Sequence, residues 1–548
     1  MKAYFDALRF ASIAVAILVV PASGQTPGQS TQTAFDILIT NARVMDGSGN
    51  PWMRADVGIR GDRIAAVGRL TGATAPVTID AKDRLVTPGF IDVHSHASGG
   101  LTNPQLRDAR ALLAQGVTLA VLNPDGGGPT DLKQQGLALE QDGIGINAAL
   151  VIGHASVRNA VMQPQSPTIS DPDAAGAPGA GARSSRRDPS PDEINKMRAI
   201  VRQAVADGAF GLSSGLFYSP GRFSKTEEVI ALAREAGGVY TSHIRDEGTY
   251  DVGVVASVDE VIRIAEEAKV RGVVSHMKCL GPDSWGLSQT LIEHIEAARS
   301  RGLEIFADQY PYEASSTGLS AAVMPDDGTA GAKEAMSGPE SRKQFLAVVK
   351  ENIRRRGGAR SIVIASGRGA PQMAGKSLEE IAKSRGVEPE QAAVDIVLAG
   401  GASIVSFNMS EDDIERIMRQ PWTMGSSDGG LVAPGAGQPH PRNNGAFARR
   451  IARYVRERQT VTLEHAIRTM TTLPARVFGF TGRGEIREGA FADLVIFDPA
   501  KVVDRATYTN PHLLADGIDW VIVNGKIARN DGEFTGVRAG RVLRKGQM

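Results

Sequence analysis

Two histidines separated by one residue form the clearest chemical motif of the sequence: His94 and His96, at the end of Gly89-Phe90-Ile91-Asp92-Val93-His94-Ser95-His96. If the apolar run is a strand, residues two apart point to the same face, so both imidazoles point the same way. Paired imidazoles suit a zinc-like ion. Taken alone, the pair fits a metal site or two surface or hydrogen-bonding histidines about equally well.

Four further side chains of the metal-ligating types each follow a short apolar run that is typical of a strand. They are Asp125, His243, His276 and Asp428. If these runs are parallel strands of a barrel, their carboxyl ends share one rim, which is where barrel active sites lie. Because a structural explanation would have to account for each residue separately, the joint pattern favours a metal site.

The central part of the chain alternates strand-like apolar runs with helical stretches. Eight such units are typical of the α/β class and of a TIM-type (β/α)8 barrel. The predicted strands lie within Leu85–Ala97, Thr118–Pro124, Ile146–His154, Phe210–Ser214, Val239–Ile244, Val273–Lys278, Glu304–Tyr310 and Trp422–Ser427.

Short predicted strands also occur near both ends of the chain, in residues 35–86 and 481–548. They predict a small β-sandwich built from both chain ends. The barrel would then occupy residues 87–480, and the amphipathic helices of residues 326–420 predict a helical insertion between its seventh and eighth strands.

The first residues have the features of an export signal. A basic start precedes the apolar run Phe10–Val20, which small residues end, and the run is too short to span a bilayer. We therefore expect a signal peptide at residues 1–24, a polar linker at 25–34 and an exported protein with no stable membrane association after cleavage. An uncleaved anchor is the alternative.

Charge and cysteine content exclude some functions. Lys plus Arg equals Asp plus Glu, 61 each, so the basic excess typical of nucleic-acid binding is absent and a small-molecule partner is favoured. Cys279 is the only cysteine, which rules out an internal disulfide. Beside an apolar stretch, it is expected to be a buried small residue rather than a nucleophile.

A series of motifs spans nearly the whole chain in order. Besides the two-histidine motif they are Gly153-His154-Ala155-Ser156-Val157-Arg158, Ser214-Gly215-Leu216-Phe217-Tyr218-Ser219-Pro220-Gly221, Tyr240-Thr241-Ser242-His243-Ile244-Arg245-Asp246-Glu247, Ser275-His276-Met277-Lys278, Asp308-Gln309-Tyr310-Pro311-Tyr312, Ser427-Asp428-Gly429, His440-Pro441-Arg442 and Leu473-Pro474-Ala475-Arg476. With these motifs the chain resembles the amidohydrolase superfamily and, within it, the N-acyl-D-amino-acid deacylase (D-aminoacylase) family. The resemblance implies a barrel with a split β-sandwich, and a hydrolase that cleaves the amide bond of N-acyl-D-amino acids.

The resemblance also implies roles for individual residues. Positions matching His243 and His276 hold metal, and a weaker second site lies at His94 and His96, so one or two zinc ions are expected. A zinc-type ion lowers the pKa of bound water to about 7. The position matching Asp428 is the catalytic base and acid.

Substrate binding is implied for Lys278, Tyr310 and Ser316, which match positions that hold the substrate carboxylate, and Arg245 is a further candidate. Other interpretations remain open for two of them. Arg245 fits equally well in a surface ion cluster with Asp246 and Glu247, and Lys278 equally well as a support for a metal ligand.

One departure from the family concerns the second predicted strand. The family often has a cysteine metal ligand there, whereas this chain has Asp125, within Asn123-Pro124-Asp125-Gly126. A carboxylate can ligate or bridge zinc but is a harder ligand than a thiolate, so the metal preference and the substrate are both open.

Two other classes of function remain as alternatives. The same site would serve a cyclic-amide, isoaspartyl-dipeptide or lactone hydrolase, because a fold does not fix a function. A non-enzymatic secreted binding protein is disfavoured, because it predicts missing ligands while the candidate set is complete.

Overall fold

The computed structural model describes residues 34–163, 186–325, 328–367 and 371–546. The predicted signal peptide, residues 1–24, and all of the predicted linker except its last residue lie outside these ranges. None of the helices in the described ranges combines the length and apolar character needed to cross a membrane.

The central strands follow chain order in two parallel sheets, one that contains β6, β7 and β8 and one that runs from β9 through β10, β11, β12 and β13 to β17. They are β6 (Phe90–Asp92), β7 (Val117–Leu122), β8 (Asn147–Leu150) with its continuation β9 (Ile152–Gly153), β10 (Gly211–Gly215), β11 (Val239–His243), β12 (Arg271–Val274), β13 (Ile305–Gln309) and β17 (Thr423–Gly425). The ring closes just past β17 and β6, where the Asp428 amide donates to the His94 carbonyl at 2.9 Å and the His96 amide donates to the Gly429 carbonyl at 2.9 Å. These parallel pairings and the contacts between the two outer strands agree with a TIM-type fold, and each predicted strand overlaps an observed one.

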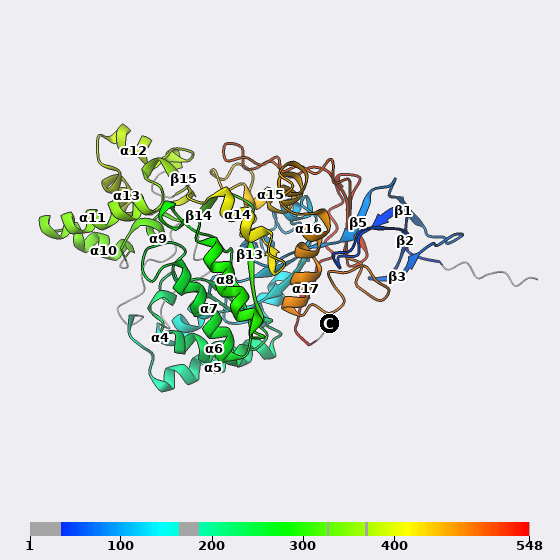
Figure 1. The fold of residues 1–548 in the computed structure, drawn as a ribbon, viewed down its shortest axis with the longest axis horizontal. Helices are drawn as coiled ribbons and strands as arrows, with labels where there is room; N and C mark the ends of the chain where they lie inside the picture. The colour runs from blue at the N-terminus through cyan, green and yellow to red at the C-terminus, as the bar shows by residue number, and fades with distance from the viewer. Residues whose placement is uncertain (1–33, 164–185, 326–327, 368–370, 547–548) are drawn as a thin grey trace, which may run out of the picture.

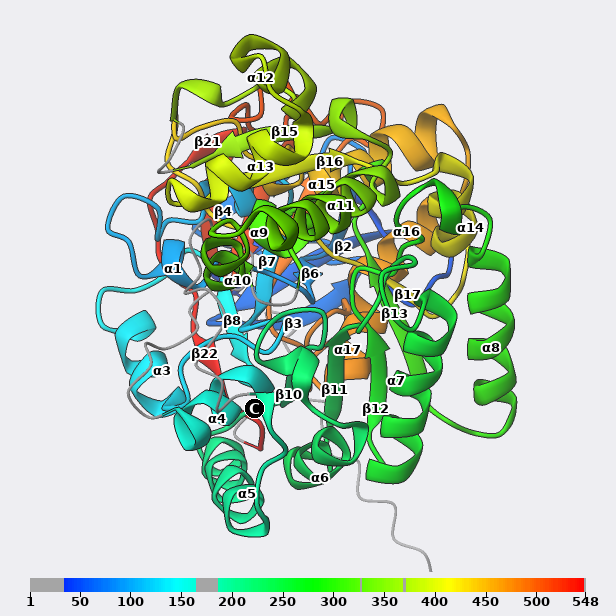
Figure 2. The ribbon, with the colours of Figure 1, turned by 90° about the vertical axis from the view of Figure 1, so that its left-hand side faces the viewer.

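Helices alternate with these strands, and α5 to α8 lie along the outside of β10 to β13 (Figure 2). A Ser190–Glu193 capping box starts α5, whose Met197, Val201 and Ala204 face the core. The helices outside the insertion are α1 (Ser98–Leu101), α2 (Arg110–Leu113), α3 (Leu132–Glu140), α4 (His154–Met162), α5 (Pro191–Ala206), α6 (Thr226–Ala236), α7 (Val254–Ala268), α8 (Ser288–Ser300), α14 (Glu411–Met418), α15 (Arg442–Arg449), which a π-helical turn over Arg450–Glu457 extends, α16 (Leu463–Met470) and α17 (Thr472–Phe478).

Strands from both chain ends join in one nine-stranded sheet, where β5 pairs antiparallel with β18. Its members are β1 (Ile37–Val44), β2 (Met53–Arg60), β3 (Arg63–Gly68), β4 (Val77–Asp80), β5 (Leu85–Pro88), β18 (Leu494–Phe497), β19 (Ile518–Val523), β20 (Lys526–Asn530) and β21 (Glu533–Phe534). The pairings form one continuous sheet, so a two-layer sandwich stays a prediction. The predicted run Leu85–Ala97 divides between this sheet and the barrel, and β22 (Val542–Leu543) pairs with β8 instead.

An insertion with its own apolar core separates β13 from α14. It lies at the opposite end of the molecule from β1 to β3 (Figure 1). Besides the expected helices it contains a three-stranded antiparallel sheet in the order β14-β16-β15, and it begins earlier than residue 326. Its elements are β14 (Ala314–Gly318), α9 (Leu319–Val323), α10 (Gly328–Ala335), α11 (Pro339–Arg355), β15 (Ile362–Ser366), α12 (Leu378–Arg385), α13 (Pro389–Leu398) and β16 (Ser403–Phe407).

Candidate metal centre

All six predicted metal-site side chains meet at the carboxyl-terminal rim of the barrel. His94 and His96 follow β6, Asp125 follows β7, His243 ends β11, His276 follows β12 and Asp428 follows β17. Five of them are buried and His96 is nearly so. The parallel strands thus bring together residues that are far apart in the sequence.

Asp125 is the centre of this cluster. Its Oδ2 lies 3.3 Å from His94 Nε2 and 3.4 Å from His96 Nε2, while its Oδ1 lies 3.6 Å from His276 Nε2 and 3.9 Å from His243 Nδ1. Burial opposes ionisation of Asp125, but the surrounding imidazoles, His94 foremost, outweigh it and hold the pKa well below its usual range. One carboxylate therefore faces four imidazoles.

The donor atoms of the cluster fit a metal ion. Within the described part of the chain, Asp125 Oδ1, Asp428 Oδ1 and both ring nitrogens of His243 are buried without a hydrogen-bond partner. Such atoms are rare in folded proteins and require an explanation. A nitrogen and oxygen donor set of this kind suits a zinc-like ion. Two overlapping groups could hold one: His94, Asp125, His276 and Asp428, and His243, Glu247 and His276.

Three of these residues have left-handed backbones: Asp125 with φ 55°, His276 with φ 34° and Asp428 with φ 48°. This conformation costs a non-glycine residue roughly 1–2 kcal/mol, so the surrounding structure must hold it in place. Gly215 at the end of β10 makes room for the Asp125 turn, because a Cβ there would lie 2.3 Å from the Asp125 carbonyl oxygen.

Glu247 belongs to the site although sequence reasoning placed it in a possible surface cluster. Its carboxylate lies 3.0 Å from His276 Nδ1 and 3.7 Å from His243 Nε2, and it pairs with Lys278. Burial is the largest influence on its pKa and raises it, yet Lys278 and the two histidines outweigh burial and lower the pKa below its usual range. The run Tyr240–Glu247, which extends past β11 to the rim, was the signal available in the sequence.

Arg442 is a second member of the site without a predicted role. Its Nη1 donates to Asp428 Oδ2 at 2.6 Å, and both side chains are buried. Burial raises the pKa of Asp428, but Arg442, followed by His276, more than compensates and holds it well below its usual range. The other oxygen, Oδ1, lies 3.2 Å from His96 Nε2 and 3.6 Å from His94 Nε2.

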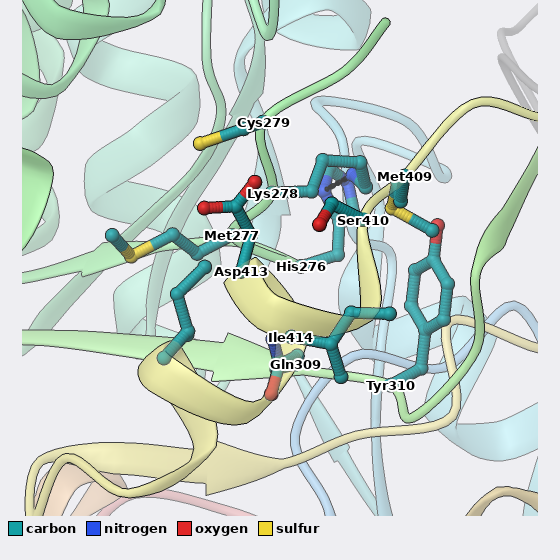
Figure 3. A pocket seen from close by; sticks show the side chains of 11 residues that line it. His276, Met277, Lys278, Cys279, Gln309, Tyr310, Met409, Ser410, Asp413 and Ile414 are labelled. Carbon is teal, nitrogen blue, oxygen red and sulfur yellow. Dashed lines mark hydrogen bonds between the residues drawn. The ribbon is translucent and has the colours of Figure 1, made fainter. Parts of the chain in front are cut away.

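Three predicted substrate-binding residues border the cluster. Lys278 Nζ lies 2.6 Å from His276 Nδ1, and Figure 3 shows this pair beside Tyr310. The Tyr310 ring centre lies 5.6 Å from Lys278 Nζ and 4.8 Å from Arg442 Cζ. Ser316, on β14, lines both of the cavities that Asp428 also lines. Lys278 thus contacts a metal-site histidine and also lines the space beside it.

The structure does not place Arg245 in the cluster, so its role in substrate binding stays a prediction that the geometry does not support. Its Nε and Nη2 bind the two Glu260 carboxylate oxygens at 2.9 and 2.8 Å, and it also donates to the carbonyls of Arg222 and Ser224. With its donors engaged away from the rim, Arg245 cannot bind a substrate without losing these bonds. Cys279 is buried as expected, and burial raises its pKa, which keeps the thiol protonated.

Three cavities border residues of the cluster, and Asp428 lines two of them. The larger, of about 930 Å³, is bordered by His96, Asp428 and Arg442 and extends along residues 431–443. The smaller, of about 20 Å³, is bordered by Lys278 and by residues of the insertion. A ligand at Asp428 can therefore extend into either cavity.

Comparison with known proteins agrees with this geometry. The chain matches the amidohydrolase family over residues 77–529, and a second match, to the N-terminal domain of the urease alpha-subunit, covers residues 16–90. The chain belongs to the amidohydrolase family, which confirms the resemblance of its motifs.

Relatives that match nearly the whole chain include deacylases. D-aminoacylase of Alcaligenes xylosoxydans xylosoxydans is 35% identical over 94% of this chain and 99% of its own length. N-acyl-D-glutamate deacylase of the same organism is 37% identical over 90% of this chain and 93% of its own length. The chain also superposes on the crystal structure of N-acyl-D-glutamate deacylase from Bordetella bronchiseptica, with a TM-score of 0.76 and 35% sequence identity over 93% of this chain and all of that one. That structure contains zinc and a phosphonate inhibitor that mimics the tetrahedral intermediate of the reaction.

Proposed function

We propose that this protein is a zinc-dependent hydrolase that cleaves N-acyl-D-amino acids to a carboxylate and a free D-amino acid. The observation that carries the proposal is the convergence of four imidazoles on Asp125 next to Asp428, in a chain that shares nearly its full length with D-aminoacylases. Zinc is supported by the donor set and by the zinc-bound relative.

The residues of the chain divide the work. His94, His96, Asp125, His243 and His276 hold one or two ions, which supply a Lewis acid and an acidified water when bound. The remaining steps belong to Asp428, whose ionised Oδ1 accepts the proton of the attacking water and returns it to the leaving amine nitrogen.

Arg442 positions Asp428 for this task. Because its guanidinium holds Oδ2, Oδ1 is turned toward His94 and His96, where the reacting atoms must lie. Lys278, Tyr310 and Ser316 then hold the α-carboxylate of the substrate, and the acyl group extends into the larger cavity.

We also propose that the protein is exported with its first 24 residues removed. This rests on the basic start, the apolar run and the small residues that follow it. Determining the N-terminal residue of the protein after expression in a bacterium, in periplasmic and cytoplasmic fractions, tests the proposal.

The function is tested with the metal-loaded protein and pairs of N-acetyl-D- and N-acetyl-L-amino acids. We expect bound zinc, release of D-amino acids only, and loss of at least about 10³-fold in kcat for Asp428→Asn, because the amide cannot accept the proton. Asp504→Asn is the matched control, since Asp504 pairs with Arg449 away from the centre. Zinc without cleavage of either enantiomer would contradict the proposal and direct the search to cyclic amides, dipeptides and lactones.

A further inference from the structure

A buried guanidinium from the insertion lies in the wall of the small cavity. Arg356 directly follows α11 and is 2% exposed. Its Nε donates to the Ala322 carbonyl at 3.3 Å, whereas its Nη1 has no hydrogen-bond partner among the described residues. No carboxylate of the described ranges lies within 4.0 Å of it.

An arrangement of this kind is costly in a folded protein. Arginine stays protonated in proteins, so burial cannot be relieved by loss of the charge. A buried charge normally has a paired counter-charge, because desolvation alone is unfavourable. A buried positive charge with no counter-charge among the described residues, lining a cavity next to a candidate active centre, is suited to pairing with a bound anion.

The other cations at the site already have partners. Lys278 pairs with Glu247, and Arg442 pairs with Asp428. Of the described residues that line the small cavity, Arg356 is thus the cation left to neutralise a further negative charge. The same cavity, of about 20 Å³, is also lined by Phe217, Leu280 and Thr317.

The position of Arg356 is fixed by contact between the insertion and the barrel. The loop after β12, which carries Lys278, passes so close to α11 that a Cβ on Gly281 would lie 1.9 Å from the Arg355 carbonyl oxygen. Tyr250, from the loop after β11, lies with its ring centre 5.8 Å from Arg356 Cζ. Both barrel loops therefore hold the guanidinium at the site rather than in solvent.

We propose that Arg356 binds the side-chain carboxylate of an acidic D-amino acid and so selects N-acyl-D-glutamate or N-acyl-D-aspartate as substrate. This rests on the proposed function, in which Lys278, Tyr310 and Ser316 hold the α-carboxylate. A guanidinium can bind a carboxylate through two parallel hydrogen bonds, which gives both affinity and direction. Arg356 is a specificity residue, because it touches the substrate side chain and not the reacting bond.

Competing pairs of nearly isosteric substrates test the proposal. We expect the metal-loaded protein to prefer N-acetyl-D-glutamate to N-acetyl-D-glutamine, or N-acetyl-D-aspartate to N-acetyl-D-asparagine, by at least about tenfold in kcat/KM. Arg356→Met should abolish the preference through a higher KM for the acidic substrate, with kcat/KM for the amide substrate changed less than about threefold. Arg356→Lys should restore part of the preference, because it restores the charge.

The neighbouring Arg355→Met is the matched control, since Arg355 pairs with Glu351 and is not among the residues that line the cavity. It should keep the preference. Calorimetry with inactive Asp428→Asn protein gives a readout independent of turnover: N-acetyl-D-glutamate should bind more tightly to that variant than to Asp428→Asn combined with Arg356→Met.

Stability separates a binding role from a structural one. Loss of a buried charge without a partner should leave the Tm of ligand-free Arg356→Met unchanged or raise it. A lower Tm together with equal losses for acidic and amide substrates would overturn the proposal, as would equal wild-type rates on both. If no N-acyl-D-amino acid is cleaved at all, the proposed function fails instead, and loss of acidic-ligand binding in the double variant still reports on Arg356.

Discussion

Replacement of Arg442 by methionine should move the acidic limb of the pH–rate profile to higher pH. Arg442 Nη1 lies 2.6 Å from Asp428 Oδ2, and both side chains are 5% exposed. Two unit charges about 4 Å apart interact by about 4 kcal/mol at an effective dielectric constant of about 20. A fraction of that energy is enough to shift the limb by about one pH unit or more, since one unit corresponds to about 1.4 kcal/mol.

The direction follows from the charges. Arg442 lowers the pKa of Asp428 against the effect of burial, which raises it. In the wild type, the ionised Asp428 stabilises the fold above the pKa of the unfolded state, and this stabilisation is lost only as pH falls through the lower folded pKa. Without the guanidinium, burial dominates, so Asp428 takes up its proton at higher pH and can no longer act as a base there.

The assay is kcat/KM against pH for wild type, Arg442→Met and Arg442→Lys at equal zinc content. In Arg442→Lys the acidic limb should lie at a pH between those of the wild type and Arg442→Met. Arg449 lies on the same helix as Arg442 but pairs with Asp504, so Arg449→Met should leave the acidic limb unchanged. If Arg442→Met lowers the rate by the same factor at every pH, the guanidinium acts on the substrate alone and the reasoning about Asp428 is refuted.

Two further predictions concern the metal and the fold. Asp125→Asn should lose at least about tenfold in zinc affinity because the carboxylate facing four imidazoles becomes a neutral amide, whereas Asp125→Cys should retain zinc. Metal analysis after dialysis against a series of chelators measures both variants. Equal zinc content in Asp125→Asn and in the wild type would show that Asp125 is not a ligand. Glu228→Gln should destabilise the protein by about 3–5 kcal/mol, because buried Arg158 and His154 lose the charge they share, while exposed Glu227→Gln should have little effect. Denaturant unfolding measures the second prediction, which a loss below about 1 kcal/mol for Glu228→Gln would contradict.

Much of the barrel could be predicted because its strands are short apolar runs with characteristic ends. The insertion was harder for a physical reason. The strand Ala314–Gly318 is small and polar and lacks alternation, so it reads as a loop until its partner Ser403–Phe407 pairs with it. Long-range pairing of this kind leaves little local trace.

The metal cluster was predictable because parallel strands fix the positions of residues such as His94 and Asp428 at their ends. Residues on the loops beyond the strands were not. Arg245 and Glu247 are two positions apart, yet one binds Glu260 outside the site and the other contacts His276 within it. The conformation of the loop determines which of the two side chains points to the site. The sequence does not show that conformation, because charged residues in a loop are equally compatible with an exposed surface. Arg356 is further removed still, because it reaches the site only through the packing of the insertion.

The separate core of the insertion has a consequence for how such enzymes can diversify. The residues of the candidate metal cluster all lie at the ends of the central strands, whereas Arg356 comes from a unit with an apolar core of its own, which contacts the loop after β12 at Gly281. If Arg356 selects the substrate as proposed, mutations around α11 change which substrate is accepted and leave the residues of the metal cluster untouched. Substrate specificity can then evolve through mutations in the insertion alone, without changes in the central strands that carry the metal cluster.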